Sequence, residues 1–399
     1  MSGGRSPVAF VATAQPEYAR HALAELRQAA GGGRAEPLAE GVFLFQPRGD
    51  PEAVRAGLAA QPPVFLRHLH PVHRALALPD LRPEAGAELR SEAVADACGS
   101  TASGLAPLVE ATWDLLAGGG AALPPPGAAV QVQVRRLGLR GGPSAFAVKA
   151  ALDPVLAAAG FRPVSRDPEW VLSVTLCGAP AESRGGAAGQ RLAGDGGSAG
   201  AAGACRAFLG LSTPAENLSP WPGGAIHYPR AAVISRAAFK LMEALELFAP
   251  LGFCLRPGDR ALDLGAAPGG WTQVLLDRGL QVTAVDPAPL DPRLQGRPGL
   301  TFLQGRAGEV PLPPAAFDLV TCDINWHPLE TARTVAARAE VLVPGGWALV
   351  TVKLLGGGNP TAIWRRAADI LAGAGLRLVA ARQLFHNRDE VTLLLRRAD

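Results

Sequence analysis

Lysine is rare in this 399-residue chain and stands at only three positions, Lys149, Lys240 and Lys353. Arginine supplies most of the positive charge and hardly ever gives up its proton, whereas a lysine that is desolvated or lies beside another cation can lose one. Lys240 and Lys353 occur in segments that precede and follow a glycine-rich stretch, Asp263-Leu-Gly-Ala-Ala-Pro-Gly-Gly-Trp. We therefore predict a catalytic amine beside a bound cofactor.

The glycine-rich stretch follows an apolar strand pattern and opens a helix pattern, which predicts a ligand-binding turn. Gly265 lets the backbone turn tightly, and Gly269 keeps the turn free of side-chain bulk. No Gly-Lys-Ser/Thr follows, so a P-loop is excluded, and Pro268 and Trp271 are bulky for a diphosphate. Asp286 ends the next strand about twenty residues on, where a carboxylate can accept hydrogen bonds from ribose hydroxyls. These features favour S-adenosylmethionine; the alternative is a turn without a ligand in a glycine-rich chain.

From residue 235 onward, strand patterns alternate with helix patterns. The predicted strands are 260–264, 281–286, 300–304, 318–322, 347–353, 377–383 and 390–396, and the predicted helices are 235–248, 271–278, 329–342 and 361–374. Such alternation predicts an α/β fold with a doubly wound, mostly parallel sheet. The link 384–389 is too short for a parallel crossover, so the last two strands should form an antiparallel hairpin.

Four charged residues at the ends of these predicted elements match the motifs of a known enzyme family. Lys240 lies in S-R-A-A-F-K-L, Asp323 ends D-L-V-T-C-D, Lys353 lies in L-V-T-V-K-L and Glu390 lies in R-D-E-V-T. In this order they resemble the Lys-Asp-Lys-Glu tetrad of the FtsJ/RrmJ-like RNA ribose 2′-O-methyltransferases. The resemblance implies a Rossmann-like class I methyltransferase domain that uses S-adenosyl-L-methionine.

The tetrad suits the chemistry, because a ribose 2′-hydroxyl becomes a good nucleophile only when its proton is removed. The resemblance implies that Lys353 is the general base and that Lys240, Asp323 and Glu390 complete the catalytic group. The two carboxylates would orient the amines and balance their charge. Any one of these residues alone would be an ordinary surface charge, but all four occur in the expected order around the turn.

Two further segments resemble the RlmM family, whose bacterial members 2′-O-methylate a cytidine of 23S ribosomal RNA. These segments are N-L-S-P-W-P-G-G at 217–224 and A-R-Q-L-F-H-N-R-D-E-V-T at 381–392. The resemblance implies three parts, a ferredoxin-like module at 1–75, a THUMP-like RNA-binding module at 76–215 with a Gly/Ala-rich insertion at 183–204, and the methyltransferase domain at 216–399. It also implies a partner, 23S ribosomal RNA or a large-subunit precursor. The cofactor-binding residues that it carries over are Gly265, Ala266, Ala267, Pro268, Gly269, Gly270, Trp271, Asp286 and Asp323.

Two alternative functions stay open, a 2′-O-methyltransferase for another RNA and a non-catalytic RNA-binding or ribosome assembly factor that kept the fold. After strand 300–304 the family tends to carry an acidic residue near the adenine, where this chain has Arg306. Glu309 could replace that acid, or backbone groups could hold the adenine. The sequence D-I-N-W that begins at Asp323 differs from the N/D-P-P-Y/F motif of amino-methyltransferases, which argues against methylation of a base amine.

The N-terminal half also mixes strand and helix patterns, which predicts two small α+β modules. The predicted strands are 8–13, 41–45, 130–134, 170–176 and 206–211, and the predicted helices are 18–28, 51–58, 93–116 and 145–159. Arg135, Arg136, Arg140 and Lys149 are candidates for a patch that contacts RNA phosphates, with ordinary solvated charge as the alternative.

The overall composition excludes some classes of function. A net charge of only +3 excludes a strongly basic coat, so RNA binding would depend on local patches. The five cysteines form no C-x-x-C pair, which argues against a zinc site or a disulfide framework. Cys322 is predicted to be a small core residue, and His68, His70 and His73 to lie in a polar loop without metal. Without a signal-like N-terminus or a long apolar run, we expect a soluble, cytoplasmic protein with no membrane partner.

Overall fold

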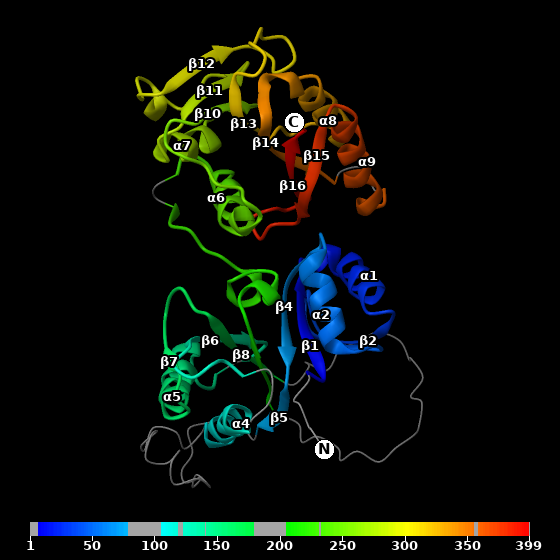
Figure 1. The fold of residues 1–399 in the computed structure, drawn as a ribbon, viewed down its shortest axis with the longest axis vertical. Coiled ribbons are helices and arrows are strands. Elements are labelled where there is room, and N and C mark those ends of the chain that lie inside the picture. Colours follow the sequence, from blue (N-terminus) through cyan, green and yellow to red (C-terminus); the bar gives the residue numbers. More distant parts are fainter. Residues whose placement is uncertain are drawn as a thin grey trace. The chain divides into compact units, whose positions relative to one another are not determined.

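The structure is a computed structural model, and it describes residues 7–78, 105–118, 123–139, 141–178, 205–230, 233–354 and 358–398. The chain divides into two compact units (Figure 1). The first contains Met1–Pro62 and His68–Gly224, and the second contains Pro63–Arg67 and Ala225–Asp399.

A seven-stranded sheet forms the centre of the second unit, in the order β12-β11-β10-β13-β14-β16-β15. Strands β10 to β14 run parallel, and β16 lies antiparallel between β14 and β15. The strands are β10 (Arg260–Leu264), β11 (Gln281–Asp286), β12 (Leu300–Gln304), β13 (Phe317–Cys322), β14 (Leu342–Lys353), β15 (Leu376–Arg382) and β16 (Glu390–Arg397). The doubly wound, mostly parallel sheet and the terminal antiparallel hairpin are therefore confirmed.

Helices cover this sheet because its central strands are apolar on both faces. The helices are α6 (Ala238–Phe248), α7 (Gly270–Asp277), α8 (Pro328–Ala336) and α9 (Pro360–Gly373). Leu241 of α6 and Leu275 of α7 are fully buried in one cluster with strand residues such as Leu319, Leu349 and Leu394. This packing holds the first turns of α6 and α7 near the carboxyl ends of the parallel strands, where open α/β sheets bind ligands.

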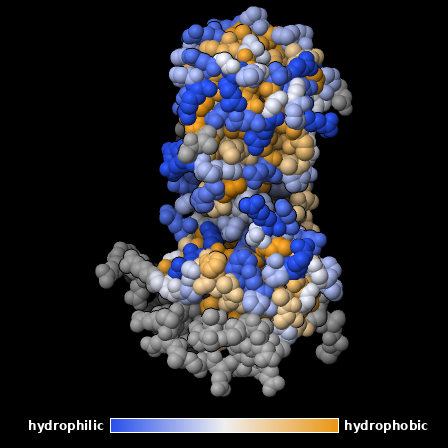
Figure 2. All heavy atoms as spheres, turned by 90° about the vertical axis from the view of Figure 1, so that its left-hand side faces the viewer, coloured by the Kyte–Doolittle hydropathy of each residue, from blue (hydrophilic) through white to orange (hydrophobic). Residues whose placement is uncertain are grey.

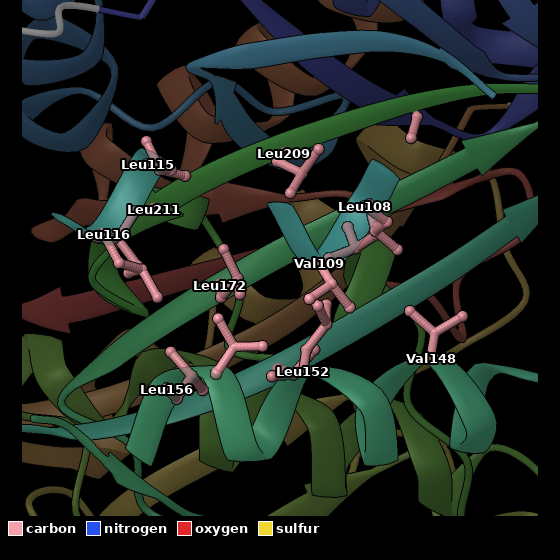
Figure 3. Packing of buried hydrophobic residues seen from close by; sticks show 14 of the residues in the cluster. Leu108, Val109, Leu115, Leu116, Val148, Leu152, Leu156, Leu172, Leu209 and Leu211 are labelled. Atoms are coloured by element: carbon pink, nitrogen blue, oxygen red, sulfur yellow. The ribbon is translucent and has the colours of Figure 1, made fainter. Parts of the chain in front are cut away.

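The first unit contains two sheets, β2-β3-β1-β4 and β5-β9-β8-β6-β7. The strands are β1 (Ala9–Ala14), β2 (Gly33–Ala39), β3 (Val42–Pro47), β4 (Leu66–Val72), β5 (Arg74–Leu78), β6 (Ala129–Leu137), β7 (Arg162–Pro163), β8 (Trp170–Cys177) and β9 (Cys205–Ser212). The helices are α1 (Ala19–Ala29), α2 (Pro51–Ala60), α4 (Ala106–Ala117) and α5 (Ala145–Ala158). Figure 3 shows leucine and valine side chains of α4 and α5 packed with those of β8 and β9.

The two sheets of the first unit share an apolar cluster. Val11 and Leu44 from one sheet and Leu137 and Phe208 from the other belong to it. Residues that the sequence assigned to two modules therefore form one compact unit, and the ferredoxin-like and THUMP-like assignments with their boundaries stay predictions. The insertion at 183–204 and the first part of the helix predicted at 93–116 lie outside the described residues.

The prediction of a polar loop around the three N-terminal histidines is wrong. His68 and His70 lie in β4 and His73 follows it, and all three are buried. Nδ1 of His70 lies 2.9 Å from the carbonyl oxygen of Pro71, and Nε2 lies 2.8 Å from Oγ1 of Thr175. Burial lowers the pKa of His70 to about 4, so the ring is neutral and can both donate and accept. Hydrogen bonds to residues that are distant in the sequence, such as Thr175, allow polar side chains to be buried in a strand, although the sequence pattern indicates a loop.

Two element boundaries also differ from the prediction. Helix α8 ends at Ala336 instead of continuing to 342, and β14 begins at Leu342 instead of 347. A Pro-Gly-Gly sequence falls inside β14, which Gly345 (φ 69°) and an irregular β13–β14 register accommodate. Strands β2, β4, β5 and β7 were not predicted.

Within the described ranges, no helix is both long and apolar enough to cross a membrane. On the face drawn in Figure 2, hydrophilic residues are interspersed with hydrophobic ones over the coloured surface.

Candidate active site

The four tetrad side chains come together at one edge of the second unit's sheet. Lys240 belongs to α6, Asp323 directly follows β13, Lys353 ends β14 and Glu390 begins β16. Nζ of Lys240 donates to both carboxylate oxygens of Asp323, at 2.7 and 2.6 Å, and lies 3.3 Å from Oε1 of Glu390. Nζ of Lys353 donates to the same Oε1. Lys353 and Glu390 face each other in the β14–β16 pairing, so strand register fixes this contact.

The tetrad is a nearly buried cluster of two amines and two carboxylates. The exposed fractions of the side chains are 9% for Lys240, 12% for Asp323, 8% for Glu390 and 15% for Lys353. Burial alone would raise the pKa of Glu390, but the charge of Lys240 and hydrogen bonds from Lys353 and the backbone of Arg388 lower it to about 2. Glu390 is therefore a carboxylate at any working pH, able to stabilise a positive charge on either amine.

The loop before β16 orients Glu390 from its other side. Oε2 of Glu390 accepts a hydrogen bond from the backbone N–H of Arg388 at 3.0 Å and one from Nδ2 of Asn387 at 3.3 Å. Oδ1 of Asn387 accepts in turn from the backbone N–H of Leu384 at 2.9 Å and from Oγ1 of Thr392 at 3.2 Å. Both oxygens of the Glu390 carboxylate are thus held in place.

Glu243 ties the same loop to the helix that carries Lys240. Its carboxylate accepts hydrogen bonds from the backbone N–H groups of Phe385 at 2.7 Å and His386 at 3.0 Å, and it is 2% exposed. The sequence interpretation did not include Glu243. Its spacing of three residues from Lys240 was the available signal, because residues three apart share a helix face.

The segment Pro63–Arg67, far upstream in the chain, is hydrogen-bonded to this loop. Arg382 donates to the backbone carbonyls of Pro63 at 2.8 Å and Arg67 at 3.3 Å. Arg67 donates to the carbonyls of Leu384 at 2.8 Å and Asn387 at 3.2 Å. The two arginines therefore hold the upstream segment against the loop that positions Glu390.

The glycine-rich turn is shaped so that only glycine fits at several positions. Gly265 has φ 73°, and a Cβ there would lie 2.2 Å from Cγ1 of Ile324. Gly269 has φ 111°, and a Cβ there would lie 2.2 Å from Cδ1 of Leu294. At Gly270 a Cβ would lie 2.2 Å from Oγ of Ser235. The glycines thus permit close packing of the turn against its neighbours as well as a left-handed backbone.

Two aspartates flank the turn in different environments. Asp286 is half-buried, and its carboxylate accepts from the backbone N–H groups of Ala267 at 3.0 Å and Ala288 at 2.8 Å. A carboxylate held this way retains acceptor capacity for ribose hydroxyls. Asp263 is buried and accepts from the hydroxyls of Thr272 at 2.6 Å and Thr321 at 2.8 Å. Burial raises the pKa of Asp263 to about 6 in spite of these hydrogen bonds.

The side chain of Trp271 is packed in the hydrophobic core of the second unit. Its side chain belongs to the core cluster, the residue is 3% exposed, and Nε1 donates to the carbonyl of Ala237 at 2.8 Å. The indole therefore supports α6, and a contact of Trp271 with the cofactor stays a prediction. In the loop after β12, the side chains of Arg306 and Glu309 are 72% and 71% exposed, and the group that contacts the adenine stays a prediction.

The residues of the turn fit a nucleoside without a diphosphate. The backbone carries small side chains at Ala266 and Ala267, the Asp286 carboxylate lies beside it, and the nine-residue stretch from Asp263 to Trp271 includes no cationic side chain for a phosphate. S-adenosylmethionine has this chemistry, with a ribose and no phosphate. Among the described residues, no group of three or more His, Cys, Asp or Glu side chains could hold a metal ion.

The basic patch predicted in the N-terminal half is not formed as expected. Arg135 is half-buried and donates to the hydroxyl of Thr13, and desolvation lowers its pKa to about 10. Lys149 forms an ion pair with Asp153 at 2.6 Å on the same helix. Arg136 is exposed, and Arg140 lies outside the described residues. Arg135 therefore serves the interior of its unit rather than a phosphate-binding surface.

Cys322 is a buried core residue of β13, as predicted. Burial raises the pKa of its thiol to about 12, which excludes a nucleophilic thiolate at this position.

A pocket with a volume of about 450 Å³ adjoins the tetrad within the second unit. Lys240 and Glu390 contribute to its lining. The other lining residues fall mainly into two kinds, aromatic rings (His227, Tyr228, Phe239, Phe385 and His386) and arginines (Arg230, Arg236 and Arg388).

Comparisons with known proteins point to the same region of the chain. The model of the FtsJ-like methyltransferase family matches residues 233–339, which include Lys240, the glycine-rich turn and Asp323 but end before Lys353. The chain is 38% identical over 183 residues to the ribosomal RNA large subunit methyltransferase M of Halorhodospira halophila, covering 44% of this chain and 51% of that protein. It is 39% identical over 197 residues to the protein of the same name from Azotobacter vinelandii, covering 46% of this chain and 54% of that protein.

One solved structure with some likeness is the fibrillarin of Aeropyrum pernix with bound S-adenosyl-L-methionine. Its TM-score is 0.32 at 18% sequence identity, covering 49% of this chain and 79% of that one. The chain spans about half the length of the curated relatives that it matches. The resemblance to FtsJ-like and RlmM-like methyltransferases, predicted from the sequence motifs, is confirmed by the family match and these relatives.

Proposed function

We propose that this chain is an S-adenosylmethionine-dependent RNA ribose 2′-O-methyltransferase that acts on large-subunit ribosomal RNA. The observation that carries the proposal is the ionic chain Asp323–Lys240–Glu390–Lys353, which lies at the ligand-binding edge of the sheet. The similarity to ribosomal RNA large subunit methyltransferase M supports the choice of RNA. In finer detail we propose a cytidine of 23S ribosomal RNA as the target, as in the RlmM family.

In this proposal the chain's own residues remove a proton and hold the reacting groups in line. S-adenosylmethionine, bound by the turn from Gly265 to Gly270 and by Asp286, supplies an activated methyl group. The amine of Lys353 takes the proton of the ribose 2′-hydroxyl, which makes that oxygen a nucleophile able to accept the methyl group. The new ammonium on Lys353 is stabilised by the ionised Glu390, whose position Lys240 and Asn387 fix.

The proposal is tested by methyl transfer from labelled S-adenosylmethionine to a panel of RNAs. The panel contains 23S ribosomal RNA and large-subunit precursors from cells that lack the modification, 16S ribosomal RNA and transfer RNA. We expect label in the large-subunit RNA only, and at least about 100-fold slower labelling with Lys353→Met protein that still binds S-adenosylmethionine. Label in another RNA alone would favour the alternative substrate. Normal ribosome assembly with unmethylated RNA, in cells carrying only Lys353→Met, would favour the non-catalytic assembly factor.

A further inference from the structure

A cluster of aromatic rings lies beside the tetrad, and no step of the proposed methyl transfer uses it. Tyr228 stacks on Phe239 and on His386, with centroids 5.6 and 5.4 Å apart. Phe385 meets His227 edge to face at 5.3 Å. Phe239 is buried, Tyr228, Phe385 and His386 are half-buried, and His227 is exposed. The cluster thus has a packed inner ring and outer rings that a ligand can reach.

The pocket that these rings line carries excess positive charge. Arg230, Arg236 and Arg388 line it, and all three are exposed. Glu390 is the one carboxylate that the described residues contribute to the lining, and it already binds Lys240 and Lys353. Ring faces next to exposed guanidinium groups fit a single-stranded nucleic acid, whose bases stack and whose phosphates are negative.

The outer rings are held in fixed positions before any ligand arrives. The backbone N–H groups of Phe385 and His386 both donate to Glu243, and Nδ1 of His386 lies 2.8 Å from the same carboxylate. The hydroxyl of Tyr228 donates to Glu246 of the same helix at 2.9 Å. A preorganised surface loses little conformational entropy on binding, which is typical of a recognition site.

We propose that this pocket receives the base and flanking phosphates of the nucleotide whose ribose is methylated. The inference rests on the proposed function and adds the recognition of the target nucleotide to it. The side chains of the tetrad are at most 15% exposed, so we infer that the ribose belongs to a nucleotide extruded from the RNA stack, which costs stacking energy. The rings of Phe385 and His227 are nearly perpendicular, and Arg67 lies over one face of Phe385. The extruded base therefore stacks on the other face of Phe385, beside His227, which replaces the lost contact. Arg236 and Arg388 bind the adjacent phosphates.

The test combines removal of a ring with removal of the base. Two synthetic RNAs contain the methylated position, and one of them carries an abasic ribose there that keeps the 2′-hydroxyl. Each is assayed with wild-type protein, with Phe385→Leu, and with the matched control Phe302→Leu, a half-buried phenylalanine on the edge strand β12. We expect removal of the base to lower kcat/KM of the wild-type protein by roughly 10- to 100-fold, the range of one stacked base.

On the complete RNA, Phe385→Leu should lower kcat/KM by a similar factor. On the abasic RNA, Phe385→Leu should cause little further loss, because removal of the base has already removed the same contact. Phe302→Leu should keep the full dependence on the base. The inference would be overturned if the loss from Phe385→Leu and the loss from removal of the base multiplied, or if wild-type protein methylated both RNAs equally. Either result would leave the proposed function intact. If the wild-type protein methylates no RNA, the proposed function fails as well. Should Phe385→Leu not bind S-adenosylmethionine, His227→Ala at the exposed ring replaces it.

A second arm tests the phosphate contacts through salt dependence. Arg236→Gln should lower the slope of log Kd against log salt by about 0.7, the contribution of one phosphate on a single strand. Arg366→Gln, at an exposed arginine of α9 that does not line the pocket, is the control and should leave the slope unchanged. An unchanged slope in Arg236→Gln would contradict the assignment of that guanidinium to a phosphate.

Discussion

Replacing Asp263 by asparagine should stabilise the protein at neutral and alkaline pH. Asp263 is buried at the end of β10 and has a pKa of about 6. A carboxyl group whose pKa is raised by folding stabilises the fold fully below its unfolded pKa, and that contribution is lost as the pH rises through the folded pKa. Asp263→Asn has no such ionisation, and its amide can still accept from the hydroxyl of Thr272 or Thr321.

The size of the effect follows from the two pKa values. Between an unfolded pKa of 3.8 and a folded pKa of about 6, ionisation of Asp263 costs about 3 kcal/mol of unfolding free energy at pH 8. About half of this cost is already present at pH 5, so the advantage of Asp263→Asn over wild type should grow by about 1.4 kcal/mol from pH 5 to pH 8. The cost of exchanging the carboxyl group for an amide does not depend on pH. The change with pH in the stability difference between Asp263→Asn and wild type therefore reports the ionisation of Asp263 alone.

The assay is urea unfolding of both proteins at pH 5, 6, 7 and 8, at constant ionic strength. Asp369→Asn, the same exchange at an exposed position of α9, serves as the control. A stability difference between Asp263→Asn and wild type that stays constant from pH 5 to pH 8 would refute the reasoning, and so would a gain that the control shares.

Three further predictions concern the active site. Lys353→Met should lower kcat by about 10²- to 10⁴-fold, the usual contribution of a general base, with the Kd of S-adenosylmethionine unchanged by calorimetry; activity close to wild type would exclude Lys353 as the base. Gly265→Ala should lower the free energy of unfolding by at least about 1–2 kcal/mol from its left-handed backbone alone, and weaken cofactor binding, because the new Cβ meets Ile324; unchanged urea unfolding would contradict the close packing of the turn. Arg67→Met should reduce kcat at least several-fold without changing cofactor affinity, because the loop that holds Glu390 loses two hydrogen bonds of about 1–3 kcal/mol each; a loss of cofactor affinity alone would argue against a positioning role.

The sheet of the second unit was predictable because its determinants are local. Strands such as β10 and β11 are short apolar runs bounded by Gly, Pro and charged residues, and the predicted bounds of both agree with the structure. Lys353 and Glu390 could be predicted to meet because each ends or begins a strand of the same sheet. Parallel strands gather such end residues at one edge.

The contacts that position the tetrad were not predictable from local pattern. Arg382 binds the backbone of Pro63 across 319 residues, and neither segment carries a periodicity that indicates the other. Burial of His70 depends likewise on Thr175 in a distant strand. Hydrogen bonds of this kind are formed by tertiary structure, so a single sequence shows only that the residues are polar.

The position of the new methyl group tests the central claim most directly. Tandem mass spectrometry of the nucleoside released from methylated large-subunit RNA distinguishes a methyl on the ribose from one on the base. The tetrad predicts that the whole added mass lies on the ribose, and that a 2′-deoxy nucleotide at the same position accepts none. A methyl on the base, or transfer to the 2′-deoxy RNA, would contradict the proposed chemistry of Lys353.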